Sequence, residues 1–406
     1  MKRLLHVNTA LNSGSHGRIC EQISALASQK GWETTIVHGA RYVNKSQFDD
    51  IQVTKHIDEI WHGVRSYLFD NHGLNSVYQT KTLIKKIQQL QPNVIHLHNI
   101  HGYYLNYKVL FSFLAKSKIP VVWTLHDCWS MTGHCAQFEQ YGCEKWKTGC
   151  HNCAYVKKEY PRAIIDRSQR NYLIKKQCFT SVENMIVVPV SHWLANLVKQ
   201  SFLAKYPIKV INNGIDIDKF RPKKNDDLRR KIAGDKKTII LGVASTWDDD
   251  KGLKEFAKLS QIPDCQVVMV GVSNSLKKKL PKSIITIART NSQEELAEYY
   301  SVADVFVNPT YKDTFPTVNI EAMACGTPVV TYQTGGSPES VTKETGIVVA
   351  KGDFNNLRQA IEAVQANGKH YYSTNCRERA VKYYNKDDRF KDYIELYENI
   401  INNRNI

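Results

Sequence analysis

Two successive series of short apolar strands and helical segments limit this chain to a small set of folds. In the first series, the strand-like stretches NVIHLHN, PVVWTLHD and MIVVPVS are each preceded or followed by a helical pattern. The second series repeats the alternation with TIILGVAST, CQVVMVGVS and VFVNPT. Strands that alternate with helices predict a parallel sheet covered on both faces. The sequence therefore predicts an α/β protein with two doubly wound, Rossmann-like domains.

A polar segment separates the two series. The stretch KVINNGIDIDKFRPKKNDD gathers Asn, Gly, Asp and Pro with a run of charge, which is typical of a linker or crossover. A chain of 406 residues is also too long for one core. We therefore expect an N-terminal domain over 1–215 and a C-terminal domain over 216–385. The final helical pattern, about 386–406, is expected to pack back on the first domain.

The charge is unevenly distributed along the chain. The net charge is +16, and residues 1–215 hold 26 Lys and Arg against 13 Asp and Glu, a net +13. Such an excess favours an anionic partner, although simple solubility is the alternative. No paired Cys/His finger or aromatic RNP box points to nucleic acid, so an anionic membrane surface or an anionic acceptor is favoured.

No apolar run approaches the ~20 residues that a membrane span needs. The start, MKRLLHVNTALNSGSHGR, resembles a first strand and loop more than a signal peptide. We therefore expect a cytoplasmic protein.

The stretch DTFPTVNIEAMACGTPVV predicts a loop, a short helix, a stop and a buried strand. Pro316 suits the first turn of a helix, and Gly326 with Pro328 ends it. This places Asp313 on the approach loop and Glu321 on the helix. The free N–H groups of such a helix start attract phosphate. An ordinary surface helix between two strands is the alternative.

A glycine-containing turn follows the first predicted strand. In SGSHGR, Gly14 and Gly17 lie between strand and helix, with Arg18 opening the helix. Exposed backbone N–H groups there would let an anionic ligand approach, but the spacing is not the dinucleotide pattern. A purely structural turn is the alternative.

Two further polar motifs follow predicted strands. His126 and Asp127 end the strand PVVWTLHD, at the edge where sites of parallel sheets lie. Lys251 precedes Gly252 at a predicted helix start, where its charge could neutralise a leaving phosphate. A structural histidine and a solvent-facing lysine are the respective alternatives.

Taken together, these motifs resemble the family 4 glycosyltransferases, retaining enzymes of the GT-B fold. GSHGR, TLHDCW, INNGID, WDDDKGL, YSVADVFVNPT, IEAMACGTPVV and GGSPE occur in the family's order over nearly the whole chain. HDCWSMTGHC and the cysteine-rich block after it also resemble the branch that builds colanic-acid-like, capsular and O-antigen polysaccharides.

The resemblance implies a hexosyltransferase-type enzyme whose C-terminal domain binds a nucleotide-diphosphate sugar and whose N-terminal domain binds the acceptor. His126 would contact the donor sugar, Asp313 its hydroxyls and Glu321 the ribose. The leaving diphosphate would be stabilised by Lys251 and by the N–H groups near Thr317 and Val318, without a catalytic metal.

The chain departs from the family at two positions. Asp313 stands where the family usually has Glu, and Thr246 stands where it usually has an Arg before the lysine. Arg289 is a candidate substitute for that arginine. These departures keep open a non-catalytic GT-B-like binding protein as a rival function.

Five of the ten cysteines lie between Cys128 and Cys153. A cytoplasmic enzyme argues against disulfides, and the Cys-x-x-Cys spacing is that of a metal knuckle. A structural zinc site would use four thiolates, with His134 and His151 as alternates. Its proposed ligands are Cys135, Cys143, Cys150 and Cys153. Buried reduced cysteines are the other interpretation.

The combined hypothesis is an enzyme peripheral to the inner face of the cytoplasmic membrane. It would extend a lipid-linked saccharide in cell-surface polysaccharide biosynthesis. A GT-B enzyme with a soluble acceptor is the alternative within the same fold, and the basic N-terminal half argues against it.

Overall fold

The computed structural model describes residues 1–234, 236 and 238–402. The chain divides into two compact units, which we call the N-terminal unit (Met1–Asn212 with the chain from Phe390 onward) and the C-terminal unit (Asn213–Arg389). Each is described by itself. The predicted helix 386–406 corresponds to α14 (Lys386–Ile401), and its last positions, 403–406, lie outside the described residues.

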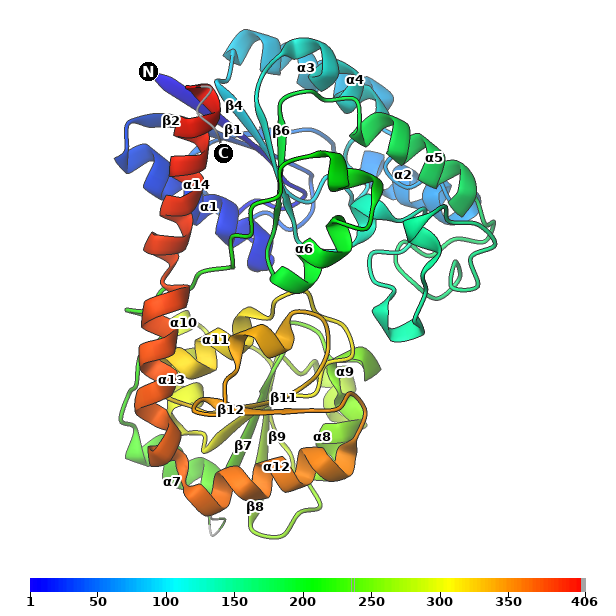
Figure 1. Cartoon of the computed structure of the whole chain (residues 1–406). Coiled ribbons are helices and arrows are strands. Elements are labelled where there is room, and N and C mark those ends of the chain that lie inside the picture. Colours follow the sequence, from blue (N-terminus) through cyan, green and yellow to red (C-terminus); the bar gives the residue numbers. More distant parts are fainter. Residues whose placement is uncertain (235, 237, 403–406) are drawn as a thin grey trace. The chain divides into compact units, whose positions relative to one another are not determined.

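The N-terminal unit is built on a six-stranded parallel sheet of order β3-β2-β1-β4-β5-β6 (Figure 1). Its strands are β1 (Lys2–Val7), β2 (Trp32–His38), β3 (Asp49–Gln52), β4 (Val94–Leu97), β5 (Val121–Leu125) and β6 (Met185–Pro189). Its helices are α1 (Gly14–Gln29), α2 (His56–Phe69), α3 (Val77–Leu90), α4 (Tyr107–Ser117), α5 (Ser168–Phe179) and α6 (His192–Val198). The order changes direction between β1 and β4, and ligands of such sheets bind at this switch point.

The C-terminal unit repeats the architecture with the sheet order β12-β11-β10-β7-β8-β9. Its strands are β7 (Thr238–Val243), β8 (Cys265–Val270), β9 (Ile285–Ile287), β10 (Val305–Asn308), β11 (Val329–Tyr332) and β12 (Gly346–Val349). Its helices are α7 (Asp226–Ala233), α8 (Leu253–Leu259), α9 (Asn274–Lys277), α10 (Gln293–Val302), α11 (Thr317–Ala324), α12 (Phe354–Asn367) and α13 (Lys369–Tyr384). Here the switch point lies between β7 and β10. The prediction of two doubly wound α/β domains is confirmed.

The last helix completes the core of the N-terminal unit. Phe390, Tyr393, Leu396 and Tyr397 recur at helical spacing and are buried with α1 on one face of the sheet. The Tyr397 hydroxyl lies 2.6 Å from Nδ1 of His96, so this helix also satisfies a buried polar group on β4.

Between β5 and α5 the chain is irregular. Residues 126–167 contain only the short 3₁₀ helices Trp129–Met131, Glu139–Tyr141 and Lys145–Lys147. Three aromatic side chains of this segment are nevertheless buried: Trp129, Phe138 and Trp146. Among the helices of the described residues, none combines the length and the apolar character that crossing a bilayer requires.

Candidate functional site

In the C-terminal unit, Lys251 lies at the switch point, on a 3₁₀ turn that follows β7. The Asp248 carboxylate accepts a hydrogen bond from the Lys251 backbone N–H at 3.0 Å and so closes the turn. Gly252 comes next, with φ of 76°. A Cβ at this position would lie 2.4 Å from Cγ of Pro309, so only glycine lets the turn approach the loop that follows β10.

Two ion pairs join these neighbouring loops. Nζ of Lys251 lies 2.9 Å from Oδ2 of Asp313, and Nζ of Lys312 lies 2.8 Å from Oδ2 of Asp250. The backbone N–H of Tyr311 also donates to the Asp250 carbonyl at 2.7 Å. The Lys251 and Asp313 side chains remain 36% and 18% exposed, so both can meet a ligand. A cation and a carboxylate predicted from separate motifs are therefore brought together.

Helix α11 begins beside this pair. Its N-cap is Pro316, which makes no side-chain hydrogen bond to the first turn, and Thr317 and Val318 are half-buried. The helix start is held by Asn319, whose side chain is buried. It accepts from Nδ2 of Asn308 at 2.8 Å and donates to Oγ of Ser337 at 3.0 Å. A helix start without a side-chain cap, fixed by a buried polar network, is suited to an anion.

Glu321 lies one turn further along α11. Its Oε2 accepts a hydrogen bond of 3.0 Å from the hydroxyl of Tyr300, a fully buried residue on α10. The half-buried carboxylate is thus oriented by a rigid partner, as a ligand-binding acid needs.

Arg289 is not part of this constellation. It is exposed on the loop that follows β9, and β9 is separated from β7 by β8. No ion pair between Arg289 and the Lys251–Asp313 pair is found within the described chain.

In the N-terminal unit, the SGSHGR segment differs from the expectation, because helix α1 already begins at Gly14. Gly17 and Arg18 therefore belong to its first turns rather than to a loop. A Cβ at Gly17 would lie 3.4 Å from Ala10 Cβ, so this glycine allows close packing. Arg18 is exposed, and its Nε donates to the Gly14 carbonyl at 3.1 Å.

His126 follows β5 and ends a line of three histidines, of which His6 and His98 are buried and His126 is half-buried. Nδ1 of His6 lies 3.1 Å from Nε2 of His98, and Nδ1 of His98 lies 3.2 Å from Nε2 of His126. We call His6, His98 and His126 the histidine file. Burial lowers the pKa of His6 and His126 to about 3 and that of His98 well below its usual value. All three rings are therefore neutral near pH 7, with one N–H each.

The buried end of the file fixes the direction of its hydrogen bonds. Nε2 of His6 is buried and meets no hydrogen-bond partner among the residues that the structure describes. A buried N–H without a partner is rarer than a buried acceptor without one, so the His6 proton belongs on Nδ1. His6 then donates to His98, and His98 donates to Nε2 of His126. The neutral His126 ring consequently carries its proton on Nδ1.

Other polar groups gather around His126. The His16 and His126 ring centroids are 6.1 Å apart, and Nδ1 of His16 lies 3.0 Å from Oδ1 of Asn8. Asp127 lies 2.8 Å from Nε2 of His101. Burial alone would raise the Asp127 pKa, but His101 and the Trp129 N–H outweigh it and lower that pKa. Residues that follow β1, β4 and β5 thus form one polar cluster.

Sequence reasoning missed the histidine file. Its signal was the HLH spacing in NVIHLHN, which places His96 and His98 on the same face of one strand. Nitrogen atoms of His6, His96 and His98 lie within 4.8 Å of one another, which is also a metal-like spacing. Both His96 nitrogens already meet hydroxyl groups, Thr124 at 2.8 Å and Tyr397 at 2.6 Å. Both His96 nitrogens are therefore already engaged in hydrogen bonds.

The four cysteines predicted to bind zinc lie near one another in the irregular segment. The pKa of Cys135 is raised by burial and by the neighbouring Cys153, Cys150 and Cys143. No three of their sulfur atoms, however, come within the 4.8 Å spacing that the histidines reach. The alternates are weaker ligands, since His134 already meets Asp70 and the Glu159 carbonyl, and His151 meets the Gly149 carbonyl.

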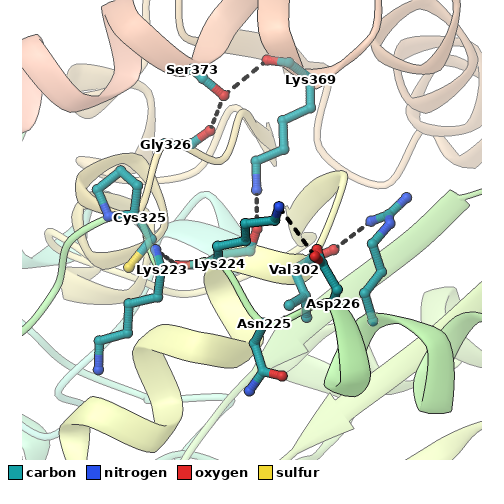
Figure 2. Close-up of a pocket in the computed structure, with 12 residues that line it drawn as sticks. Lys223, Lys224, Asn225, Asp226, Val302, Cys325, Gly326, Lys369 and Ser373 are labelled. Carbon is teal, nitrogen blue, oxygen red and sulfur yellow. Dashed lines mark hydrogen bonds and ion pairs between the residues drawn. The ribbon is translucent and has the colours of Figure 1, made fainter.

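A pocket of about 460 Å³ lies elsewhere in the C-terminal unit (Figure 2). It is bordered by the C-terminal ends of α10 and α11, and so by the amino end of the sheet, opposite the Lys251–Asp313 pair. Two of its cations serve the fold, because Lys369 donates to the Ser301 and Ala303 carbonyls and Arg229 pairs with Asp304.

Two family descriptions cover most of the chain. Residues 16–219 match Glycosyltransferase Family 4, and residues 224–383 match Glycosyl transferases group 1. A relative from Escherichia coli K12, WcaC, is named as a glycosyl transferase of colanic acid biosynthesis. It is 26% identical over 98% of this chain and 100% of its own length.

A second relative in sequence and one solved structure are also similar to this chain. An E. coli UDP-Gal:alpha-D-GlcNAc-diphosphoundecaprenol alpha-1,3-galactosyltransferase is 27% identical over 50% of this chain and 58% of its own. The structure of Anabaena HepE in complex with UDP superposes with a TM-score of 0.65 at 16% identity, covering 98% of this chain and 100% of that one. At that identity the likeness concerns the fold. Together with the family matches over both halves, these findings show that the chain belongs to glycosyltransferase family 4 and is a GT-B glycosyltransferase.

Proposed function

We propose that this enzyme transfers a sugar, with retention of configuration, from a nucleotide-diphosphate sugar to a lipid-linked saccharide during cell-surface polysaccharide assembly. The observation that carries the proposal is the Lys251–Asp313 pair beside the start of α11, at the β7–β10 switch point. The names of two relatives, one for colanic acid and one for a diphosphoundecaprenol substrate, support the acceptor class.

The C-terminal unit would hold the donor. The N–H groups near Thr317 and Val318 and the Lys251 ammonium would meet the diphosphate, because helix starts and cations favour the charge that develops on a leaving phosphate. Glu321, oriented by Tyr300, would accept hydrogen bonds from the ribose hydroxyls. Asp313 would exchange its contact with Lys251 for the sugar hydroxyls. Arg289 would contribute to binding of the diphosphate only if the loop that follows β9 changed its conformation.

The reaction would need no covalent enzyme intermediate. The bond between the sugar C1 and the diphosphate oxygen breaks, and the acceptor oxygen forms its bond to C1 on the same face. The acceptor proton passes to an oxygen of the leaving diphosphate, whose negative charge Lys251 and the α11 N–H groups stabilise. His126, neutral and protonated on Nδ1, would donate a hydrogen bond to the donor sugar.

The N-terminal unit would bind the acceptor. Gly14, Gly17 and Arg18 at the start of α1 would approach an anionic part of it, such as a lipid-linked phosphate. The enzyme would work as a peripheral protein on the inner face of the cytoplasmic membrane.

We also propose that Cys135, Cys143, Cys150 and Cys153 bind a structural zinc ion after a small rearrangement of their loops. The buried Lys175 supports this idea. Its Nζ donates to the Trp129 carbonyl at 2.7 Å, and burial lowers its pKa to about 7 while the nearby Cys150 raises it. A four-thiolate zinc site carries net negative charge, which would keep this lysine protonated.

A nucleotide-sugar screen by thermal shift tests the donor proposal, since a ligand of the folded state raises the melting temperature. The hit is then assayed for donor hydrolysis and for transfer to a diphosphoprenyl saccharide. Binding without hydrolysis or transfer would favour the rival function, a GT-B-like binding protein. Transfer to soluble saccharides alone would assign a soluble acceptor instead.

A further inference from the structure

Helix α2 of the N-terminal unit turns its apolar residues outward. Its buried side chains are polar: Glu59, His62 and Ser66 are 1–2% exposed. Seven of its exposed side chains are large and apolar, each between 38% and 62% exposed: Ile57, Ile60, Trp61, Val64, Tyr67, Leu68 and Phe69. A helix that faces water normally has the opposite arrangement.

The outward residues form one stripe. Ile57, Ile60, Trp61, Val64 and Leu68 follow the i, i+3, i+4, i+7, i+11 spacing of a single helical face. The stripe is therefore a contiguous surface and not a scatter of single apolar residues, which would need no explanation.

Internal hydrogen bonds prevent the helix from rolling to hide this stripe. Oε1 of Glu59 accepts from the Ala40 N–H at 2.5 Å and from the Thr54 hydroxyl at 2.8 Å. Nδ1 of His62 lies 2.8 Å from Oγ of Ser76. A roll would leave these buried polar groups without partners, which is unfavourable for buried donors and acceptors.

Neighbouring segments extend the surface at both ends of α2. The Ile164 N–H donates to the Tyr67 carbonyl at 2.7 Å, and Ile164 and Ile165 are 47% and 44% exposed. At the other end, Nε2 of Gln79 donates to Asp58 at 3.0 Å, beside the exposed Val77 and Tyr78. We call the exposed apolar residues of α2, with Val77, Tyr78, Ile164 and Ile165, the apolar face.

Basic side chains border the apolar face. Arg65 lies on α2 itself and is exposed. The Arg167 guanidinium lies 5.7 Å from the Phe69 ring centroid. Arg162 is exposed on the irregular segment before it, and Arg170 is exposed on the first turn of α5. An apolar stripe that contains Trp and Tyr beside arginines complements a surface with acyl chains beneath anionic headgroups.

We propose that α2 docks the enzyme on an anionic bilayer, with the apolar face in the interfacial layer and the arginines among the lipid phosphates. This inference rests on the proposed lipid-linked acceptor and names the surface that would reach it. Trp61 and Leu68 enter the layer, while Arg65, Arg162 and Arg170 meet the headgroups. Such helices lie in the membrane plane about 5–10 Å deep.

Trp61 supplies a direct reporter. It is 62% exposed, whereas the other six tryptophans are buried or half-buried. The full chain is mixed with vesicles of phosphatidylglycerol and phosphatidylethanolamine, with and without bromine on the acyl chains. Brominated acyl chains should quench part of the wild-type tryptophan fluorescence, and this quenching should be lost in Trp61→Phe. Quenching that is absent, or equal in the two proteins, would overturn the proposal.

Flotation with the same vesicles measures affinity. The double variant Trp61→Ser, Leu68→Ser should partition at least tenfold more weakly. Tyr371→Ser is the matched control, because Tyr371 is 61% exposed on α13 of the C-terminal unit, and it should float like the wild type. Added salt should weaken binding without abolishing it, because only the headgroup contacts are screened.

The remaining outcomes separate this proposal from others. If the double variant floats like the wild type while light scattering shows that it converts a dimer to a monomer, the apolar face binds a second copy of the chain and the proposal fails. Nucleotide-sugar binding by the double variant should be unchanged. If the wild type floats and is quenched but binds no nucleotide sugar, the docking surface stands and the proposed function fails.

Discussion

Mild acid should destabilise the N-terminal unit selectively. Of the 14 histidines, 13 precede Asn213, and His370 is the one in the C-terminal unit. Burial lowers the pKa of His6, His62 and His126 from 6.5 to about 3. As the pH falls from 6.5 toward 3, these histidines bind protons in the unfolded chain but stay neutral in the folded unit. The free energy of unfolding is thus unaffected above pH 6.5 and decreases below it.

The magnitude follows from those values. At pH 5.5, a histidine with pKa values of about 3 folded and 6.5 unfolded lowers the free energy of unfolding by about 1.4 kcal/mol. For His6, His62 and His126 together, the loss is about 4 kcal/mol. His72, His96 and His98 add to it in the same direction. This is a large part of the 5–15 kcal/mol typical of a domain.

Tryptophan fluorescence can assign the transition, because six of the seven tryptophans precede Asn213 and only Trp247 lies in the C-terminal unit. Thermal unfolding is followed by fluorescence and by circular dichroism at pH 7.5, 6.5 and 5.5. At pH values below 6.5, the midpoint temperature of the fluorescence transition should decrease. The thermal unfolding curve measured by circular dichroism should then split into two steps. His98→Gln should reduce the pH dependence, whereas the exposed His56→Gln should not. A fluorescence midpoint that is equal at pH 7.5 and 5.5 would refute the reasoning.

Four further predictions concern individual residues. Glu321→Ala should weaken nucleotide binding by about 10- to 100-fold, which is the contribution of a hydrogen bond to a charged group. If calorimetry shows unchanged affinity, Glu321 is not part of the site. Asp313→Asn should lower turnover more than it lowers affinity for the free nucleotide. His98→Gln should disturb the Nδ1–H tautomer of His126, which ¹⁵N NMR of labelled histidines detects, and should lower turnover about 3- to 10-fold. In the wild type, ¹⁵N chemical shifts typical of metal-bound imidazole, or an Nε2–H tautomer of His126, would contradict the hydrogen-bond direction. Freshly purified protein should hold about one zinc per chain, and Cys150→Ser should lose it while Cys178→Ser keeps it; a metal-free wild type would end the zinc proposal.

The fold could be predicted from the sequence because both sheets are parallel and buried. Strands such as Val121–Leu125 and Val305–Asn308 are buried at every position, so they are nearly continuous apolar runs between helical patterns, with one polar residue in each, Thr124 and Asn308. The residues of the candidate site could be named for the same reason, since Lys251, Asp313 and His126 each follow such a run. What the sequence did not provide was which strands are neighbours. The contact between Lys251 and Asp313 depends on β7 lying beside β10, although 62 residues separate the two side chains.

Two features depended on contacts that no local pattern encodes. The spacing of HIDEIWHGVRSYLF indicates an amphipathic helix, which would ordinarily turn its apolar stripe inward. The opposite orientation follows from Glu59 bonding to Ala40 and Thr54, which lie outside the helix. The role of His98 likewise depends on the alignment of β1 with β4, where His6 and His96 are register partners.

Under the proposed function, the Lys251–Asp313 pair would let donor binding release the Asp313 carboxylate. At 2.9 Å the two charges are in direct contact, and each is partly open to solvent, so the pair contributes little to stability. An incoming diphosphate carries more negative charge than one carboxylate and is also attracted by the start of α11. It can therefore draw the Lys251 ammonium away from Asp313 at small cost. In the proposed mechanism, the released carboxylate would then accept hydrogen bonds from the sugar hydroxyls, so that donor binding itself would prepare the acid for its proposed role.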